Sequence, residues 1–477
     1  MKFDGATSSG TESYFRKHPS SASTLLGKTG FRVSRAGFGG YRIHERDAEH
    51  RAALELALRS GCNTIDTSSN YTDGSSERLI GSVLKKIFDS GELSREEVVV
   101  VTKGGYLQGA NLALAQERKR SGKPFPEMVE YHPDCWHCIS PEFLEDQITR
   151  SLERLGLARL DVFLLHNPEY FLKTDPNHGE YYRRIGGALA HLEKEAARGR
   201  IQFYGISSNT FVEPKEHPEF TSLDTILEIA EQTSPKNRFA VVQFPLNLLE
   251  CGGVVENNNA YKTVAELADA RHLGTLINRP LNAYHGRELI RLADFGVHDE
   301  LTAKKTLDSA LAEAVRLELE LGKTDDTALA TWARMLTDHR KDIRGIIQWK
   351  DILGLQIRPF LNSLSRPRQK PYLDAMTRAV KAMTDVLESR ESARSGRIKE
   401  ALSRHCPSLV STPSLSGKTI RILGSFPGID CVLVGMRKPE YVRDALSAGA
   451  PLSAEEAFES LNAISELIEN DQLGAPS

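Results

Sequence analysis

Four polar side chains with complementary chemistry stand at, or shortly after, the end of a short apolar run. They are Asp66 and Tyr71 after Cys62–Ile65, Lys103 after Val98–Thr102, and His166 after Leu160–Leu165. Apolar runs of this length are typical of buried strands. Catalytic groups at the carboxyl ends of successive strands are typical of the active site of a (β/α)8 barrel.

These residue types predict proton transfer to an oxygen atom. A tyrosine hydroxyl has an unperturbed pKa of about 10, so Tyr71 needs assistance to exchange a proton near neutral pH. A neighbouring ammonium group lowers the pKa of a phenol, which is the role we expect for Lys103. Asp66 would keep that ammonium charged and in place, and His166 would donate a hydrogen bond to the substrate oxygen. None of the four is a hydride donor, so a redox reaction here requires a cofactor.

Strand-like and helix-like patterns alternate along the chain, which favours parallel βαβ units. Helices are expected between the strands, for example at residues 49–60, where Gly61 follows as a C-terminal cap. We therefore expect an α/β fold, a (β/α)8 TIM barrel. Its strands are expected to end at Phe38–Gly39, Thr64–Asp66, Val101–Lys103, Leu164–His166, Tyr204–Ser207, Val241–Gln243, Leu276–Asn278 and Leu433–Gly435.

Two segments exceed what a plain barrel of about 250 residues needs. The first is a long loop after strand three, at residues 104–140, with a charged run at residues 117–123 that we expect to be solvated. The second is a helical insertion between strands seven and eight, at residues 282–417. Apolar residues recur there at helical spacing, at Leu373, Met376, Val380, Met383 and Leu387. Both segments are expected beside the active site, because βα loops open at the C-terminal face of a barrel.

The predicted organisation has three parts. Residues 1–25 are rich in Ser and Thr and are expected to form a mobile N-terminal tail. Residues 26–281 and 418–460 are expected to form the barrel, and residues 282–417 an inserted helical subdomain. Residues 390–416 contain two prolines and are expected to be partly irregular. The insertion would either close the substrate pocket or offer a surface to a protein partner.

The composition excludes several classes of function. Of 477 residues, 40% are hydrophobic and 26% charged, which is ordinary for a globular protein. The formal net charge of -3 gives no broad basic field, so nucleic acid and anionic membranes are poor candidates as partners. No apolar run approaches the roughly 20 residues of a membrane helix. Six cysteines show no disulfide framework, which favours a reducing, cytoplasmic setting.

Several blocks of the sequence resemble the aldo-keto reductase superfamily across the whole barrel. They are Leu25–Ser34 with Gly37–Gly40, Asn63–Tyr71 with Gly74–Gly81, Thr102–Gly104, and Ser151–Gly156 with Leu164–His166. The resemblance implies that Asp66, Tyr71, Lys103 and His166 are the family's catalytic tetrad, with Tyr71 as the general acid. It also implies an oxidoreductase that interconverts an aldehyde or ketone and its alcohol, with a small-molecule substrate.

The same resemblance implies a nicotinamide cofactor, NADP, with NAD as the alternative. The matching positions are Ser207, Asn209, Gln243, Arg279, Leu281, Gly435, Arg437, Lys438, Tyr441 and Asp444. The first three match contacts to the nicotinamide carboxamide, the next two the loop over the pyrophosphate, and the last five the adenosine end. Arg437 and Lys438 would pair with a 2′-phosphate.

The chain departs from the family pattern at positions that concern the cofactor. Leu246 stands where the family usually has an aromatic residue that stacks on the nicotinamide. Arg279 replaces a small hydroxyl residue, Tyr441 stands where a Gln or Arg is frequent, and Ala445 replaces an amide. These departures bear on cofactor affinity and on the preference for NADP over NAD, but they leave the tetrad intact.

Two other functions compete with carbonyl reduction. A nucleotide-sensing regulatory or scaffold protein on the same fold would bind NADPH with little turnover. A zinc-dependent hydrolase on the same barrel is the other, but the strand ends lack His or carboxylate ligand sets for it. A separate zinc site would use the cluster His132–Cys138, in which Cys135 and Cys138 have C-x-x-C spacing. Because no second ligand pair follows at a typical distance, we expect no metal. Trp136 is expected instead to pack the loop over the barrel mouth, with His137 near the substrate side.

Overall fold

The computed structural model describes residues 5–286, 288–321, 331–364, 367–470 and 472–473. The chain divides into two compact units. Unit 1 comprises residues 1–281 and 417–458, and unit 2 comprises residues 282–416 and 459–477. Within the described residues, no helix is both long enough and apolar enough to cross a membrane.

Unit 1 contains a closed barrel of eight parallel strands, in the order β10-β11-β12-β15-β3-β4-β5-β9. All eight predicted strands are present; five end at the predicted residue, and β5, β11 and β15 end one or two residues away, at Gly104, Pro245 and Val434. The strands are β3 (Ala36–Gly39), β4 (Thr64–Asp66), β5 (Val99–Gly104), β9 (Leu160–His166), β10 (Ile201–Ser207), β11 (Phe239–Pro245), β12 (Gly274–Asn278) and β15 (Cys431–Val434). Most of their residues are buried, which explains why they read as continuous apolar runs rather than as alternating patterns.

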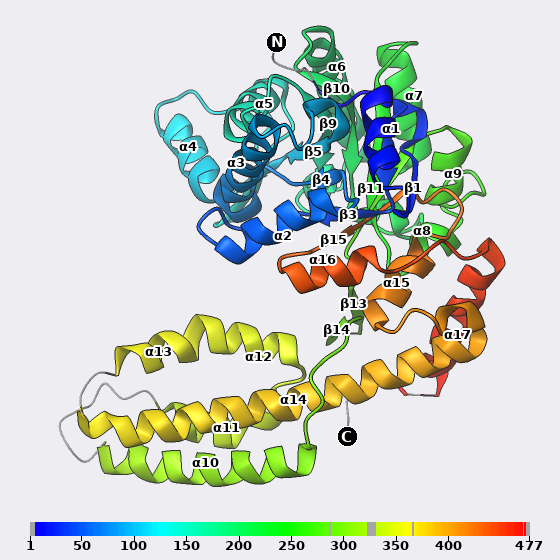
Figure 1. Cartoon of the computed structure of the whole chain (residues 1–477). Coiled ribbons are helices and arrows are strands. Elements are labelled where there is room, and N and C mark those ends of the chain that lie inside the picture. The colour runs from blue at the N-terminus through cyan, green and yellow to red at the C-terminus, as the bar shows by residue number, and fades with distance from the viewer. Residues whose placement is uncertain (1–4, 287, 322–330, 365–366, 471, 474–477) are drawn as a thin grey trace. The chain divides into compact units, whose positions relative to one another are not determined.

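Helices surround the strands in Figure 1. They are α2 (Ala48–Arg59), α3 (Ser75–Asp89), α5 (Pro141–Leu155), α6 (His178–Ala197), α7 (Leu223–Thr233), α8 (Gly252–Val255), α9 (Val264–Ala270), α15 (Leu415–Leu423) and α16 (Pro439–Leu446). The helix α2 shows which sequence signals predicted a helix and its two ends. The Asp47 side chain caps it by accepting hydrogen bonds from the N–H groups of Glu49 and His50. Gly61 follows its end at a φ of 96°, as the sequence predicted.

The N-terminal segment corrects the prediction of a mobile tail. Residues Ser8–Lys17 form the helix α1, and the side chain of Tyr14 is fully buried. Its hydroxyl donates a hydrogen bond of 2.7 Å to the carbonyl oxygen of Leu58. The strands β1 (Ser23–Leu25) and β2 (Arg32–Ser34) then pair antiparallel. Residues 1–4 of the expected tail lie outside the described residues.

The segment between β5 and α5 is folded rather than a long loop, which corrects a second prediction. It holds α4 (Gly109–Arg120) and an antiparallel sheet of β6 (Tyr106–Leu107), β8 (Cys135–His137) and β7 (Val129–His132). The charged run that we expected in a loop forms the last turn of α4 as far as Arg120. A small apolar core holds the segment together, formed by Leu107, Leu112, Ala115, Phe125, Trp136, Cys138 and Phe143.

Unit 2 is built largely from helices. Its elements are β13 (Asn282–His285), β14 (Glu288–Arg291), α10 (Glu300–Leu321), α11 (Trp332–His339), α12 (Ile346–Ile352), α13 (Arg358–Ser363) and α14 (Lys370–His405). A π-helical turn at Leu353–Ile357 joins α12 to α13. A further helix, α17 (Ala454–Glu469), begins in unit 1 and ends in unit 2.

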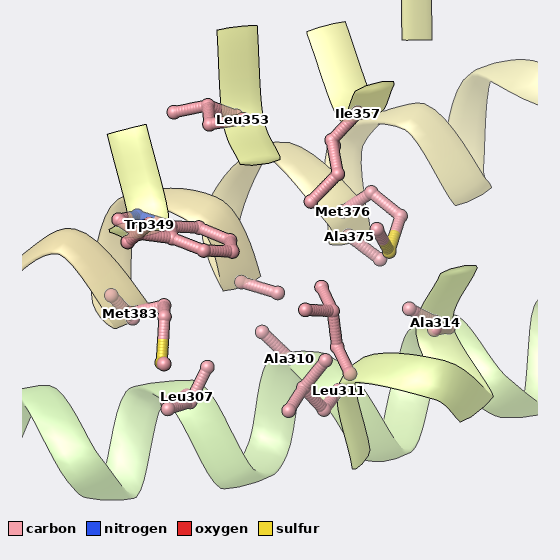
Figure 2. Close-up of a cluster of buried hydrophobic side chains, with 14 of the residues drawn as sticks. Leu307, Ala310, Leu311, Ala314, Trp349, Leu353, Ile357, Ala375, Met376 and Met383 are labelled. Carbon is pink, nitrogen blue, oxygen red and sulfur yellow. The ribbon is translucent and has the colours of Figure 1, made fainter. Parts of the chain in front are cut away.

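The long helices α10 and α14 lie side by side (Figure 1) and share a core with α12. Figure 2 shows this core, in which Trp349 lies among Leu307, Met376 and Met383. The predicted apolar stripe of α14 is therefore core. Because α14 continues to His405, the prediction of partly irregular structure from residue 390 is wrong up to that point.

Candidate active site

The barrel brings Asp66, Lys103 and Tyr71 into direct contact. The Lys103 Nζ lies 2.7 Å from Asp66 Oδ2 and donates a second hydrogen bond of 2.9 Å to the carbonyl oxygen of Thr67. The Tyr71 hydroxyl lies 3.4 Å from the same Nζ. Lys103 is completely buried because β4 and β5 are neighbours and both end at this face. A buried ammonium group is stable only when paired, and Asp66 supplies the pairing charge.

Tyr71 stands on a backbone that is held in an unusual conformation. Thr72 and Asp73, directly after it, have positive φ values of 47° and 54°. A β-branched residue such as Thr72 rarely adopts this conformation. Its hydroxyl donates a 2.7 Å hydrogen bond to the carbonyl oxygen of Ile43, and Asp73 accepts one from the N–H of Ala110. These contacts stabilise the turn that presents the phenol to the site.

The electrostatics differ from the sequence prediction for Tyr71. Burial and the nearby charge of Asp66 raise its pKa well above the usual value of 10. Burial also lowers the pKa of Lys103, and the charge of Asp66 opposes that shift. We expected Lys103 to lower the pKa of the phenol; its ammonium does lie 3.4 Å from the hydroxyl, but burial and the charge of Asp66 outweigh it. Tyr71 therefore holds its proton at neutral pH and is suited to donate it.

His166 completes the group from the end of β9. Its Nδ1 lies 3.0 Å from the Ser68 hydroxyl, and its backbone carbonyl oxygen accepts a 2.7 Å hydrogen bond from His137 Nε2. Burial, with the charge of Lys103 as a further cause, lowers the pKa of His166 well below 6.5. Burial lowers the pKa of His137 to about 4. Both imidazoles are neutral at physiological pH.

Aromatic side chains that sequence reasoning missed surround these groups. Tyr106 packs edge-on against His166 with ring centroids 4.7 Å apart, and Tyr41 packs against Tyr71 at 5.2 Å. Tyr170 extends the group, at 4.9 Å from Tyr106 and 5.0 Å from Tyr131. Tyr106 and Tyr170 stand three and four residues after Lys103 and His166, so aromatic residues just beyond the strand ends were the available signal.

The positions matched to the nicotinamide carboxamide are connected to the tetrad. The Ser207 hydroxyl donates to Gln243 Oε1 over 2.9 Å, and Gln243 Nε2 donates to Asp66 Oδ1 over 2.9 Å. Gln243 therefore contacts the carboxylate that holds Lys103, which the sequence did not indicate. The backbone N–H of Asn209 donates to Glu169 Oε1 over 2.9 Å.

Glu169 is a second residue that sequence reasoning missed. It is 1% exposed; its Oε1 accepts from Asn167 and Asn209, and its Oε2 has no partner at ordinary hydrogen-bond distance among the described residues, although the Ser208 hydroxyl contributes to holding down the pKa of the carboxyl. Burial raises its pKa to about 7. Its place three residues after the strand-end His166 was the only signal in the sequence.

The remaining cofactor positions lie past the ends of β12 and β15. Asn278 Oδ1 and Arg279 Nε are buried atoms that find no hydrogen-bond partner within the described ranges, and Arg279 has a φ of 53°. Open space surrounds Gly435, where an added Cβ would meet no atom within 4 Å. The Arg279 Nε–H donor and this space fit a group with phosphate oxygens, whereas Asn278 Oδ1 only accepts and would need a donor from a ligand. Leu281, Arg437 and Asp444 are partly exposed, and Tyr441 is exposed.

Lys438 and Leu246 carry features that bear on the choice between NADP and NAD. Lys438 Nζ lies 3.8 Å from Glu49 Oε2 and 3.6 Å from Glu440 Oε1, so carboxylates already neighbour this ammonium. Leu246, at the position expected for a stacking aromatic ring, is fully buried.

The cluster His132–Cys138 is not arranged as a metal site. His137 donates to the carbonyl oxygen of His166, and burial raises the pKa of the Cys138 thiol to about 11, so the thiol stays protonated. Trp136, which we expected to pack the loop over the barrel mouth, packs in the apolar core of its own segment. Across the described part of the chain, no group of three or more His, Cys, Asp or Glu residues is placed to hold a metal ion.

Comparison with known proteins shows the family. The sequence profile of the Aldo/keto reductase family matches residues 36–283, which is more than half of the chain. The chain therefore belongs to the aldo/keto reductase family, and the resemblance of the sequence blocks is confirmed.

The relatives are distant. A region of 209 residues is 28% identical to the NADH-specific methylglyoxal reductase of Escherichia coli, covering 42% of this chain and 56% of that protein. A region of 149 residues is 30% identical to a putative voltage-gated potassium channel subunit beta of Schizosaccharomyces pombe, covering 30% and 36%. An aldo-keto reductase structure from Bacillus halodurans, in its holo form, aligns with a TM-score of 0.48 at 15% identity, covering 93% and 96%. The two sequence alignments thus span about half of the relatives' length or less.

Proposed function

We propose that this protein is an NAD(P)H-dependent oxidoreductase that interconverts an aldehyde or ketone and its alcohol. The observation that carries the proposal is the contact of Tyr71 with Lys103, whose ammonium is held by Asp66. A phenol that keeps its proton at neutral pH, beside a fixed positive charge, is placed to protonate an oxygen that gains negative charge. His166 borders the same place from β9.

The residues of this chain divide the work of the reaction. Tyr71 donates its hydroxyl proton to the carbonyl oxygen as negative charge develops there. Lys103 stabilises the phenolate that remains, and Asp66 keeps Lys103 charged. A nicotinamide cofactor, when bound, supplies the hydride. In the oxidation direction, the phenolate of Tyr71 takes the proton of the alcohol.

The cofactor proposal rests on the chemistry of the strand ends. Arg279 offers an unpartnered buried N–H donor among the described residues, and Gly435 leaves open space, and both suit phosphate oxygens. Ser207, Asn209 and Gln243 would hold the nicotinamide end, and Leu281, Arg437, Lys438, Tyr441 and Asp444 the rest. Because Glu49 and Glu440 neighbour Lys438, pairing of this lysine with a 2′-phosphate competes with two carboxylates. NADP is our first proposal, and NAD remains the alternative, since the Escherichia coli relative is named as NADH-specific.

A second candidate function is a nucleotide-binding sensor or scaffold with little turnover. The observation that favours it is the similarity to a putative potassium channel subunit beta. The unit at residues 282–416 would then provide the surface for a protein partner.

One experiment separates the two candidates. The full chain would be titrated with NADPH and with NADH to measure binding, and then assayed for cofactor oxidation on a panel of aldehydes and ketones. The reductase proposal expects turnover that saturates with substrate. Tight binding of either cofactor without turnover across the panel would favour the sensor, and the absence of binding would overturn both.

A further inference from the structure

The segment between β5 and α5 is joined to both members of the pair formed by Tyr71 and Lys103. It is joined to Lys103 by the chain itself, because it begins where β5 ends at Gly104. It reaches the Tyr71 turn through Asp73, whose Oδ1 accepts a 3.0 Å hydrogen bond from the N–H of Ala110 at the start of α4. The two side chains that lie 3.4 Å apart are thus connected a second time, outside the barrel sheet.

The contact between Asp73 and α4 is close. Among the described residues, the N-cap residue of α4, Gln108, makes no side-chain cap hydrogen bond. The Asp73 carboxylate caps the helix instead, at an end where a negative charge is favourable. At Gly109, which has a φ of 51°, an added Cβ would lie 2.6 Å from Asp73 Oδ1. A glycine at this position therefore leaves room for the carboxylate.

The apolar core of the segment holds α4 in place. Leu112 and Ala115 of α4 belong to this core together with Trp136 of β8. At the base of the segment, the N–H of Cys138 donates to the carbonyl oxygen of Gly105 over 2.9 Å. The helix is therefore fixed relative to the end of β5, and it gives the Tyr71 turn a firm support.

The turn that carries Tyr71 needs such support. Thr72 and Asp73 both have φ values in the left-handed region, which non-glycine residues rarely adopt. Such conformations persist only where neighbouring contacts hold them. The carbonyl oxygen of Ile43 holds Thr72, and α4 holds Asp73. Release of Asp73 would let the phenol move relative to the Lys103 ammonium.

We propose that Asp73 is a positioning residue, and that the segment between β5 and α5 acts through it to fix the distance between Tyr71 and Lys103. This inference rests on the proposed reductase function. Tyr71 remains the proton donor, and Asp73 acts only through the turn that carries it. A displacement of about 1 Å at a reacting group can cost about 10²-fold in rate, so even a partial release is measurable.

Two variants release the contact from opposite sides. Asp73→Gly removes the carboxylate and still permits a positive φ, and Gly109→Ala places a Cβ against the carboxylate. Each should lower kcat about three- to tenfold, the range of one ordinary hydrogen bond, with little change in the Kd for NADPH. Asp73→Asn keeps an acceptor oxygen and should restore kcat. Gly122→Ala is the control, because Gly122 also has a positive φ, of 74°, but an added Cβ there would meet no atom within 4 Å.

A combination with Tyr71→Phe shows whether Asp73 acts through Tyr71. In Tyr71→Phe no phenol proton remains to be positioned, so Asp73→Gly should lower the residual turnover no further. An equal loss in both backgrounds would indicate a general structural defect and would overturn the proposal. An unchanged kcat in both Asp73→Gly and Gly109→Ala would overturn it as well.

The position of the Tyr71 ring can also be followed without turnover. Full-length protein labelled with carbon-13 at the tyrosine Cζ would be studied by NMR, with Tyr71→Phe used to assign the Tyr71 signal. Gly109→Ala should shift or split this signal, whereas Gly122→Ala should leave it in place. An unmoved signal in Gly109→Ala would contradict the positioning role. A shifted signal in a protein that turns over no carbonyl would defeat the reductase function while sustaining the structural coupling.

Discussion

Buried polar groups are paired in the core of unit 2 but partly unpaired at the strand ends of the barrel, among the described residues. In the core of unit 2, the carboxylate of Glu318 is buried but fully engaged. It accepts from the N–H of Ala333, from Arg334 and from the Tyr372 hydroxyl, at 2.8, 2.8 and 3.1 Å. An apolar cluster that includes Trp349, Leu307 and Met376 makes up the core of the same unit. Buried polar groups there stabilise a fold and leave nothing for a ligand to complete.

The strand ends of the barrel show the contrasting case. Ser69, Glu169, Asn278 and Arg279 each have a buried polar atom that lacks a hydrogen-bond partner among the described residues. All four stand at or just past the ends of β4, β9 and β12. A buried polar atom without a partner costs about 1–3 kcal/mol, which a bound group would remove. His191 Nε2 on α6 also lacks a partner among the described residues, so the strand ends are set apart by holding four such atoms. This difference locates the expected ligand at the strand ends of the barrel. Substitutions there should change activity, whereas substitutions in the core of unit 2 should change stability.

The largest expected effect is on catalysis and comes from the barrel. Tyr71→Phe removes the proton donor while the ring stays, so turnover should fall about 10²–10⁴-fold with little change in unfolding free energy. Steady-state kinetics and denaturant unfolding check the two parts. Tyr41→Phe, which loses a hydroxyl on the neighbouring exposed ring, is the control and should change turnover far less. Equal losses in the two variants would contradict the role of Tyr71.

A substitution of the buried Trp349 in unit 2 should lower stability rather than activity. Trp349 is fully buried among Leu307, Met376 and Met383, and its Nε1 donates to Thr384 Oγ1 over 2.8 Å. Trp349→Ala should therefore lower the unfolding free energy by about 3–5 kcal/mol, as measured by urea denaturation of the full chain. Trp349→Phe keeps most of the buried ring and should cost less. If Trp349→Ala lowered the unfolding free energy by less than Leu355→Ala, a substitution of an exposed residue, the buried position of Trp349 would be contradicted.

A pH-dependent effect is expected at Glu169. Its pKa rises from 4.5 to about 7 on folding, so the folded state holds an extra proton between these pH values. Stability from this group is complete below pH 4.5 and is lost as the pH rises through about 7. Glu169→Gln, which keeps the acceptor oxygen without the charge, should gain roughly 3 kcal/mol over the wild type at pH 8 and little at pH 4.5. Urea unfolding at both pH values measures this, and an equal difference at the two would refute it.

The smallest expected effect tests the corrected N-terminal segment. Tyr14→Phe removes the hydroxyl that donates to the Leu58 carbonyl oxygen and leaves that oxygen unsatisfied. The cost should be about 1 kcal/mol in unfolding free energy. Tyr131→Phe removes an exposed hydroxyl and serves as the control. If Tyr14→Phe matched this control, α1 would not be packed as described.

The barrel strands were predictable because their physics is local. The strands β4, β5 and β9 are short apolar runs that end at or beside a polar residue, so Asp66, Lys103 and His166 marked their own positions. The helix α1 was missed because its segment is polar apart from Tyr14 and Phe15, and its stability comes from burying those two rings. Its boundaries carry no strong periodic signal.

Contacts between distant parts of the sequence could not be predicted, because they depend on how the whole barrel closes. Gln243 and Asp66 are 177 residues apart, and only closure of the barrel joins them. The net pKa of Tyr71 is a second example. The sequence predicted the ammonium of Lys103 beside the phenol, but it did not show the burial and the nearness of Asp66 that together raise the pKa.

The most direct test of the central claim is the transfer of an isotope. Wild-type protein and Tyr71→Phe would be incubated with a carbonyl from the panel and NADPH that carries deuterium at the reactive carbon of the nicotinamide. Mass spectrometry of the product should find deuterium on the carbinol carbon with the wild type, and far less product with the variant. Bound NADPH that leaves no deuterium in any product of the wild-type protein would contradict the account.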